Sequence, residues 1–339
     1  MSSEKLIVPK FIYKNPVIGF ISPSAGLAGI FKYRVERAIR WFEKQGFKVK
    51  LSKNFWKAGY IAGEPEERAK DLNEMIYERE VKAIICSIGG DHSIQLLKYI
   101  DFKAFRKNPK IFVGFSDITV LHLAFYKASR VQTFYGPMVL TQFGEYPKPF
   151  DYTVEHFFKV VMKKEKVIEV RATSYTDQFL DWSKYKNVAR TKFKKNKFLW
   201  LREGVTKGKL IGGCLPSILR VAGTKYFPSF KNSIIFLETP EGEKPGKPYL
   251  LEKVDADLSQ LIEIGIFDKA KGLILGVPYR YTEKMKKEFY QLILKRLKDY
   301  DFPILANVNF GHTDPIITIP YGSVGILNSY ENKFKIKIF

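Results

Sequence analysis

The first half of the chain alternates between short apolar runs and helical patterns. Apolar runs at residues 17–21, 81–86 and 111–115 are each followed closely by Ser, Gly or Asp residues, as expected for strands that run into turns. Between them, apolar residues recur at helical spacing, and one such stretch stops at Gly46, a typical helix C-cap. This alternation predicts a parallel sheet with helices on both faces.

The second half repeats the pattern after a polar, lysine-rich stretch with little periodicity. Four buried-strand patterns alternate with amphipathic helical stretches, and the last residues alternate in β fashion. We therefore predict three parts. Residues 1–165 form a flavodoxin-like, doubly wound α/β domain, residues 166–205 connect, and residues 206–339 form a smaller α/β domain with mixed strands.

Composition narrows the class of protein. The chain has 339 residues, 45% of them hydrophobic, and no apolar run approaches the roughly 18 residues of a membrane span. Its first residues lack the apolar core of a signal peptide. Its two cysteines, Cys86 and Cys214, lie in apolar surroundings, which fits reduced thiols better than a disulfide. We expect a cytoplasmic protein with no membrane contact.

Charge leaves two interpretations open. Lysine and arginine number 57 against 35 acidic residues, a net charge of +22. The densest basic clusters, near Lys163 and Lys194, lack the aromatic residues of an RNA-recognition strand and any helix-turn-helix pattern, so nucleic acid is the less favoured partner. The excess either draws an anionic substrate into a positive cleft or is spread over the surface for solubility.

Ser116 lies where the apolar run 111–115 turns directly into a helical pattern. A hydroxyl there can cap the helix, which is the more common role. It can also be a nucleophile, because a strand-to-helix elbow presents its side chain at the sheet edge, where the helix N-terminus favours negative charge. The loops at residues 22–26 and 89–93 also follow strands, so we expect a ligand site where the three meet.

Two other polar residues also follow buried strands, Glu238 and His312. A serine needs a base to become nucleophilic, and the base needs a carboxylate to fix its tautomer. Ser116, Glu238 and His312 are therefore a candidate triad, although spacing along the chain cannot show that they meet. No HExxH motif or paired Cys or His spacing appears, and "GGDHS" lacks a nucleotide-binding spacing, so we expect no metal and no cofactor.

Several segments, taken in order, resemble the serine peptidase family of LD-carboxypeptidases and microcin-immunity proteins. The resemblance extends over about residues 16–329, and its segments read GFISPSAG, AGEPEERAKDLNEMI, AIICSIGGDHSIQLLKYID, KIFVGFSDITVLH, TFYGPM, GKLIGGCLPSILRVAGT, IIFLETPEGEKP and NVNFGHTDP. The stretches FLWLREGVTKGKLIGGCL and FLETPEGEKP are more similar to the microcin-immunity branch. The resemblance implies a metal-independent serine carboxypeptidase whose triad falls on Ser116, Glu238 and His312.

The family also implies an oxyanion hole of backbone amides, which falls on Asp117 and on Gly90 or Asp91. His92 and Ser93 stand where members of the branch often carry Asn-Ser or Gly-Ser, so they are candidate substrate contacts. The family further implies a homodimer, with each site between an N-terminal and a C-terminal domain.

Two substrate classes fit the resemblance: an L,D-linked murein peptide and an aminoacyl-nucleotide-type amide, the second being favoured by the branch. The alternative function is a non-catalytic protein on the same scaffold that binds anions or nucleic acid, which the net charge of +22 supports.

Overall fold

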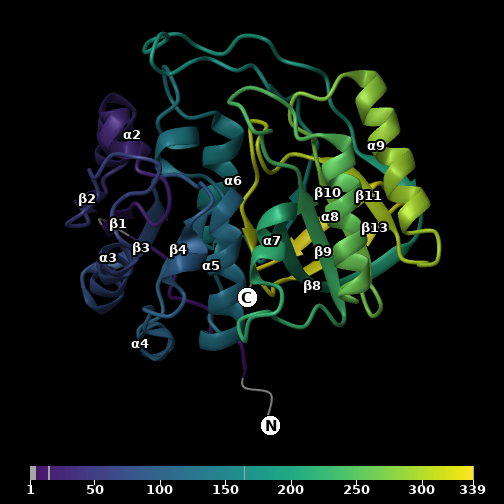
Figure 1. The fold of residues 1–339 in the computed structure, drawn as a ribbon, viewed down its shortest axis with the longest axis horizontal. Coiled ribbons are helices and arrows are strands. Elements are labelled where there is room, and N and C mark those ends of the chain that lie inside the picture. Colours follow the sequence, from purple (N-terminus) through teal and green to yellow (C-terminus); the bar gives the residue numbers. More distant parts are fainter. Residues whose placement is uncertain (1–4, 14–15, 164, 339) are drawn as a thin grey trace.

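The computed structural model describes residues 5–13, 16–163 and 165–338. Two sheets stand side by side, each with helices packed against it (Figure 1). In spatial order, the first sheet consists of β12 (Ile319–Pro320), β5 (Phe134–Tyr135), β4 (Ile111–Gly114), β3 (Val81–Cys86), β1 (Val17–Ile21) and β2 (Lys48–Leu51). All of its pairs are parallel except β12 with β5.

Helices follow the strands of the first sheet as the alternating pattern predicts. They are α1 (Leu27–Ile30), α2 (Lys32–Lys44), α3 (Pro65–Tyr77), α4 (Phe102–Lys107), α5 (Thr119–Ala124) and α6 (Asp151–Val161), with short 3₁₀ turns η1 (Ser93–Leu96) and η2 (Ser116–Ile118) and π turns η3 (Phe125–Ser129) and η4 (Val139–Phe143). Helix α2 stops just before Gly46, whose φ of 85° is the left-handed conformation of a C-cap glycine.

The second sheet is mixed, as predicted. In spatial order it consists of β6 (Val167–Val170), β14 (Lys333–Lys337), β13 (Val324–Asn328), β8 (Val205–Cys214), β9 (Ser233–Glu238), β10 (Gly272–Gly276), β11 (Ile304–Val308) and β7 (Leu199–Arg202). Strands β8 to β11 are parallel, and the outer pairs are antiparallel. Its helices are α7 (Leu215–Val221), α8 (Leu251–Glu263) and α9 (Glu283–Arg296).

Two short strands lie where the sequence pattern predicts none, and a third, β12, lies in the C-terminal stretch predicted to be β but pairs outside the second sheet. Strands β6 and β7 stand at the two ends of the predicted connecting segment, residues 166–205, and form the two outer strands of the second sheet. Strand β12 leaves the C-terminal half and pairs with β5 in the first sheet. The predicted boundaries at residues 165 and 205 stay a prediction. Strand β12 belongs to the predicted C-terminal domain by sequence but pairs with a strand of the N-terminal one.

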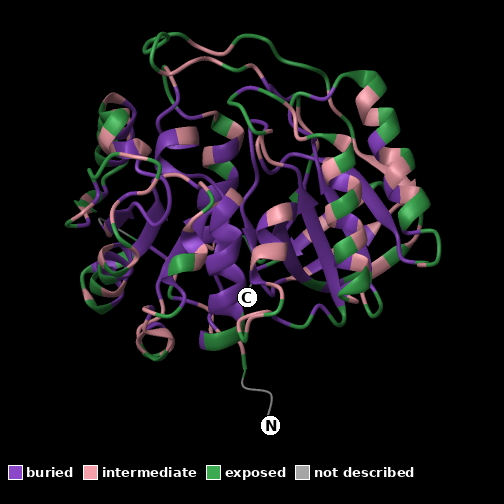
Figure 2. Cartoon of the chain, viewed as in Figure 1, coloured by how far each residue is buried: buried purple, intermediate pink, exposed green. Residues whose placement is uncertain are grey.

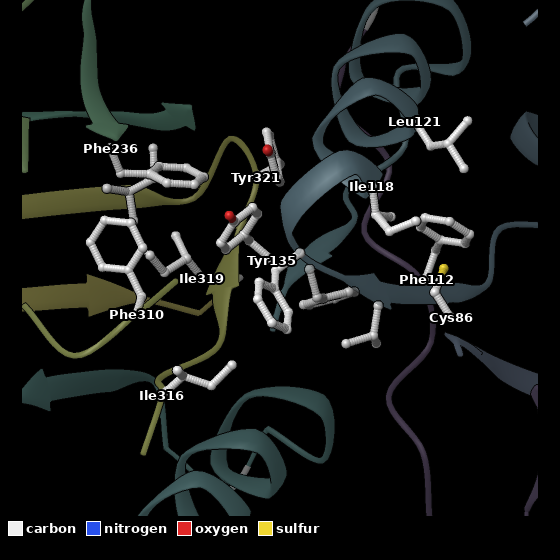
Figure 3. Close-up of a cluster of buried hydrophobic side chains, with 14 of the residues drawn as sticks. Cys86, Phe112, Ile118, Leu121, Tyr135, Phe236, Phe310, Ile316, Ile319 and Tyr321 are labelled. Carbon is white, nitrogen blue, oxygen red and sulfur yellow. The ribbon is translucent and has the colours of Figure 1, made fainter. Parts of the chain in front are cut away.

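One continuous hydrophobic core joins the two sheets. Buried residues run through the centre of the molecule (Figure 2), and its aromatic part lies between the sheets (Figure 3). The ring of Phe236 in β9 lies 5.4 Å from that of Tyr135 in β5 and 5.3 Å from that of Tyr321. The sheets are therefore held in one relative position, and the ends of their strands face each other.

The structure also bears on the two cysteines and on membrane-spanning helices. Cys86 and Cys214 are both buried and free. Within the described residues, no helix has the length and apolar character needed to cross a membrane.

Candidate active site

The backbone around Ser116 forms a tight elbow. Strand β4 ends at Gly114, Phe115 is extended, and Ser116, the first residue of η2, adopts a φ of 62°. A non-glycine residue in this left-handed region costs about 1–3 kcal/mol, so the surrounding structure must hold it. Gly114 permits the turn, because a Cβ there would lie 2.9 Å from a side-chain carbon of Ile118. Ser116 thus lies where predicted, at the first helical turn after an interior strand.

The structure brings the three predicted triad residues together from three elements. His312 Nε2 lies 3.1 Å from Ser116 Oγ, and His312 Nδ1 lies 2.8 Å from Glu238 Oε2. An ionised carboxylate only accepts hydrogen bonds, so Nδ1–H donates to Glu238 and the neutral Nε2 accepts from the Ser116 hydroxyl. This tautomer is the one in which a histidine acts as a general base toward serine.

Gly311 allows His312 to approach Glu238. Its φ is 95°, and a Cβ at this position would lie 2.7 Å from Glu238 Oε2 and 2.8 Å from Glu238 Cβ. Any other residue at 311 would push the loop away from the end of β9. A glycine is therefore needed at position 311 for His312 to reach Glu238.

Opposing effects act on the His312 imidazole. Burial by itself lowers its pKa, but the carboxylates of Glu238, Glu241 and Asp314 outweigh burial and raise the pKa above the usual 6.5. The imidazolium that forms when a base takes a proton is stabilised by the same carboxylates.

A second group of contacts holds the turn that follows β3. The Asp117 carboxylate accepts from Ser24 Oγ at 2.7 Å and from Ser93 N at 2.9 Å, and Ser93 Oγ donates to Asp117 O. Arg220 of α7 reaches both Asp117 and Asp91. The predicted oxyanion-hole residues therefore lie beside one another, and a Cβ at Gly89 would lie 3.0 Å from Ser116 Oγ.

The two candidate substrate contacts differ in their surroundings. The Ser93 side chain is fully buried and bonded to Asp117. The His92 ring lies edge-on to that of Tyr60, with centroids 5.3 Å apart, and its Nδ1 has no hydrogen-bond partner among the described residues. Contact of either residue with a substrate stays a prediction.

A cleft opens beside His312. The residues between β6 and β7, 171–198, here called the covering segment, cross the molecule from one half to the other (Figure 1). The residues that line the cleft include five aromatic side chains, Phe115, Phe179, Trp182, Tyr185 and Tyr279, and six residues that carry or can carry charge, Arg34, Glu145, Arg190, Glu241, His312 and Asp314. No lysine is among the described residues of this lining.

The arginines of the cleft are already paired with carboxylates. Arg190 Nη2 lies 2.7 Å from both Glu145 and Asp314, and Arg34 lies 3.4 Å from Glu145. Two cations thus face three carboxylates once Glu241 is included. The lysine excess of the chain is not concentrated in this lining, which favours the solubility interpretation of the charge.

The covering segment is attached to both halves of the chain. Thr176 and Asp314 exchange backbone hydrogen bonds, and the Tyr33 hydroxyl donates to the carbonyl of Trp182. The guanidinium of Arg34 lies 4.3 Å from the ring centroid of Trp182. The sequence pattern indicated only a connection here, because polar residues without periodicity do not show what they cover.

Sequence reasoning also missed Tyr135. Its hydroxyl donates to Glu238 Oε1 at 2.6 Å and accepts from Ser116 N at 3.3 Å. Burial, together with the nearby Glu238 carboxylate, raises the pKa of Tyr135, so the hydroxyl stays protonated. The segment TFYGPM carries part of the family resemblance, but nothing in its spacing signals a contact with Glu238.

The fold and the site define the class of protein: a two-sheet α/β protein with serine, histidine and glutamate in contact at the strand ends, an arrangement that serine hydrolases use. The comparisons place the chain within one family of peptidases. It belongs to the LD-carboxypeptidase family, whose N-terminal domain matches residues 18–136 and whose C-terminal domain matches residues 207–326.

Two relatives show how far the similarity extends. The chain is 30% identical over 321 residues to the microcin C7 self-immunity protein MccF of Escherichia coli, covering 93% of this chain and 91% of that protein. It is also 30% identical over 328 residues to a probable murein peptide carboxypeptidase of Bacillus subtilis, covering 95% and 92%. The relatives thus include both a microcin-immunity protein and a murein carboxypeptidase, the two branches of the resemblance.

Solved structures agree with this placement. MccF in complex with glutamyl sulfamoyl guanosine superposes with a TM-score of 0.90 at 28% identity, covering 98% of each chain. The MccF-like protein of Bacillus anthracis superposes with a TM-score of 0.89 at 30% identity, covering 98% of this chain and all of that one. The resemblance and the fold class predicted from the sequence are confirmed.

Proposed function

We propose that the chain is a serine carboxypeptidase-type hydrolase with Ser116 as nucleophile, His312 as general base and acid, and Glu238 as the carboxylate that orients His312. The observation that carries this proposal is the continuous contact from Ser116 Oγ through the imidazole to the buried Glu238. No metal or cofactor has a role in it.

The proposed reaction proceeds through an acyl-enzyme. Ser116 Oγ attacks the carbonyl carbon of a terminal amide while its proton passes to His312 Nε2. The oxyanion of the tetrahedral intermediate accepts hydrogen bonds from the backbone N–H of Asp117 and of Gly90 or Asp91. His312 then protonates the leaving nitrogen, the C–N bond breaks, and a water activated by His312 hydrolyses the ester at Ser116.

We infer that the substrate is an aminoacyl-nucleotide-type amide. MccF structures bind glutamyl sulfamoyl guanosine and aspartyl sulfamoyl adenosine, and the aromatic side chains of the cleft suit a planar base. An L,D-linked murein peptide is the second candidate, supported by the name of the Bacillus subtilis relative. Comparison of hydrolysis rates for an aminoacyl sulfamoyl adenosine and an L,D-tetrapeptide decides between them.

Labelling by a fluorophosphonate tests the nucleophile. We expect wild type to be labelled at Ser116 and Ser116→Ala to lose labelling and hydrolysis, with kcat lower by about 10⁴-fold or more. Ser259→Ala is the matched control, because that serine lies on α8 and its hydroxyl donates to the carbonyl of Asp255 in the same helix. Absence of labelling together with salt-dependent binding of random-sequence nucleic acid would instead support the non-catalytic alternative.

The homodimer implied by the family and the cytoplasmic location expected from the sequence stay predictions. Light scattering on the purified full chain measures the first, and cell fractionation measures the second. A monomer over the concentration range used for activity would contradict the homodimer.

A further inference from the structure

Tyr135 touches both ends of the proposed catalytic array. It lies in β5, directly beside β4, which leads into Ser116. Its hydroxyl donates to Glu238 Oε1 at 2.6 Å and accepts from the backbone N–H of Ser116 at 3.3 Å. Its side chain is completely buried between the two sheets (Figure 3).

The first contact concerns the orientation of the Glu238 carboxylate. One oxygen of Glu238 faces His312 and the other faces Tyr135, so rotation about the Cγ–Cδ bond would break both hydrogen bonds. A buried carboxylate needs donors, and a phenol supplies one without a positive charge. The negative charge of Glu238 thus remains available to the imidazole, whereas a lysine or arginine at this place would pair with it.

The second contact concerns the backbone of the nucleophile. Ser116 is in the left-handed region, and its amide is held by the Tyr135 hydroxyl. This amide is therefore engaged and points away from a role as an oxyanion donor, which leaves that role to the amides of Asp117 and Gly90 or Asp91.

We propose that Tyr135 is a positioning residue of the hydrolytic site, whose hydroxyl sets the orientation of Glu238 toward His312 and holds the backbone of Ser116. This inference rests on the proposed function, because it assigns to Tyr135 a role in the reaction of Ser116.

The surroundings set the direction of the expected pH effect. The other titratable or charged groups around His312, Glu238 and Tyr135 are Glu241, Asp314 with its partner Arg190, Cys214, Tyr321 and His122, whose ring centroid lies 6.0 Å from that of Tyr135. None of these is hydrogen-bonded to Tyr135. Removal of the Tyr135 hydroxyl takes one donor from Glu238 and leaves more of its charge to His312, so the apparent pKa of the base moves upward.

The test compares Tyr135→Phe with Tyr321→Phe. Tyr321 is equally buried and packs in the same aromatic cluster (Figure 3), but its hydroxyl donates to the carbonyl of Gly212 and not to a triad residue. The rate of fluorophosphonate labelling is measured against pH for wild type and both variants. We expect Tyr135→Phe to be labelled about 10- to 100-fold more slowly than wild type, and the acid limb of its pH–rate profile to lie at higher pH. Tyr321→Phe is expected to match wild type in labelling rate and in pH–rate profile.

Each outcome decides one point. Equal rates and pH profiles for wild type and Tyr135→Phe would overturn this inference and leave the proposed function intact. An unlabelled wild type would overturn the proposed function and this inference with it. Should Tyr135→Phe fail to fold, 3-fluorotyrosine at position 135 keeps the shape and donates a stronger hydrogen bond. It is expected to move the acid limb to lower pH, and an unchanged limb would overturn the inference.

Discussion

Gly89 tests where the oxyanion of the proposed reaction lies. A Cβ at this position would be 3.0 Å from both Cβ and Oγ of Ser116 and 3.3 Å from the amide nitrogen of Asp117. The φ of Gly89 lies outside the left-handed region, so its φ does not oppose an alanine at this position. Gly89→Ala therefore adds one methyl group beside the nucleophile and the proposed donor and changes little else.

The expected loss of activity follows from these distances. An oxyanion donor acts at about 2.7–3.1 Å from the oxygen, and the methyl group occupies space next to the Asp117 N–H. Loss of one donor lowers kcat by about 10²- to 10³-fold, or about 2.7–4 kcal/mol of transition-state stabilisation. The free energy of unfolding should change by less than about 1 kcal/mol, because alanine also restricts the unfolded chain.

The assay pairs Gly89→Ala with Gly272→Ala. A Cβ at Gly272 would be 3.2 Å from Thr206 Cγ2 and 3.3 Å from Leu327 Cδ1, so the crowding is similar, but Gly272 begins β10 and the site lies at the other end of that strand. We expect the control to keep the wild-type kcat. A folded Gly89→Ala protein with kcat within about threefold of wild type would refute the placement of the oxyanion hole.

The charges around the site set three further expectations. Because His312 is a base only when neutral, kcat/KM should fall as the pH drops through the pKa of His312, which lies above 6.5. The stability that this raised pKa contributes has the opposite dependence: it is present below pH 6.5 and is lost as the pH rises through the pKa of the folded state. Urea unfolding of wild type and His312→Ala across pH checks that sign. Arg190→Ala should lower the free energy of unfolding by about 3 kcal/mol, because Glu145 and Asp314 lose this buried partner, and a loss under about 1 kcal/mol would contradict the pairing. Since the cleft lining has no excess of cations, kcat/KM for an anionic substrate and for a neutral analogue should respond alike to added salt, and a steeper response of the anionic substrate would restore the positive-cleft interpretation.

Local patterns were sufficient for the long, regular elements. The buried runs that became β3, β4 and β9 have the continuous apolar character of strands covered on both faces, and α2 ends near its glycine. Strand β12 lies in the C-terminal stretch whose alternation predicts β structure, but periodicity could not indicate that its two residues pair with the first sheet. It exists because Tyr135 and its neighbour offer an unpaired edge to a segment nearly 200 residues away.

Neighbouring residues alone were enough to predict that Ser116, Glu238 and His312 each lie at or just after the end of a buried strand. Whether the three residues meet depends on how the two sheets pack, because their hydrogen bonds join residues 196 and 74 positions apart in the chain. The same holds for Tyr135, which bonds to Glu238 across 103 residues, and for the covering segment above the cleft. Secondary structure is set by periodicity along the chain, whereas hydrogen bonds between distant side chains are set by the packing of a shared core.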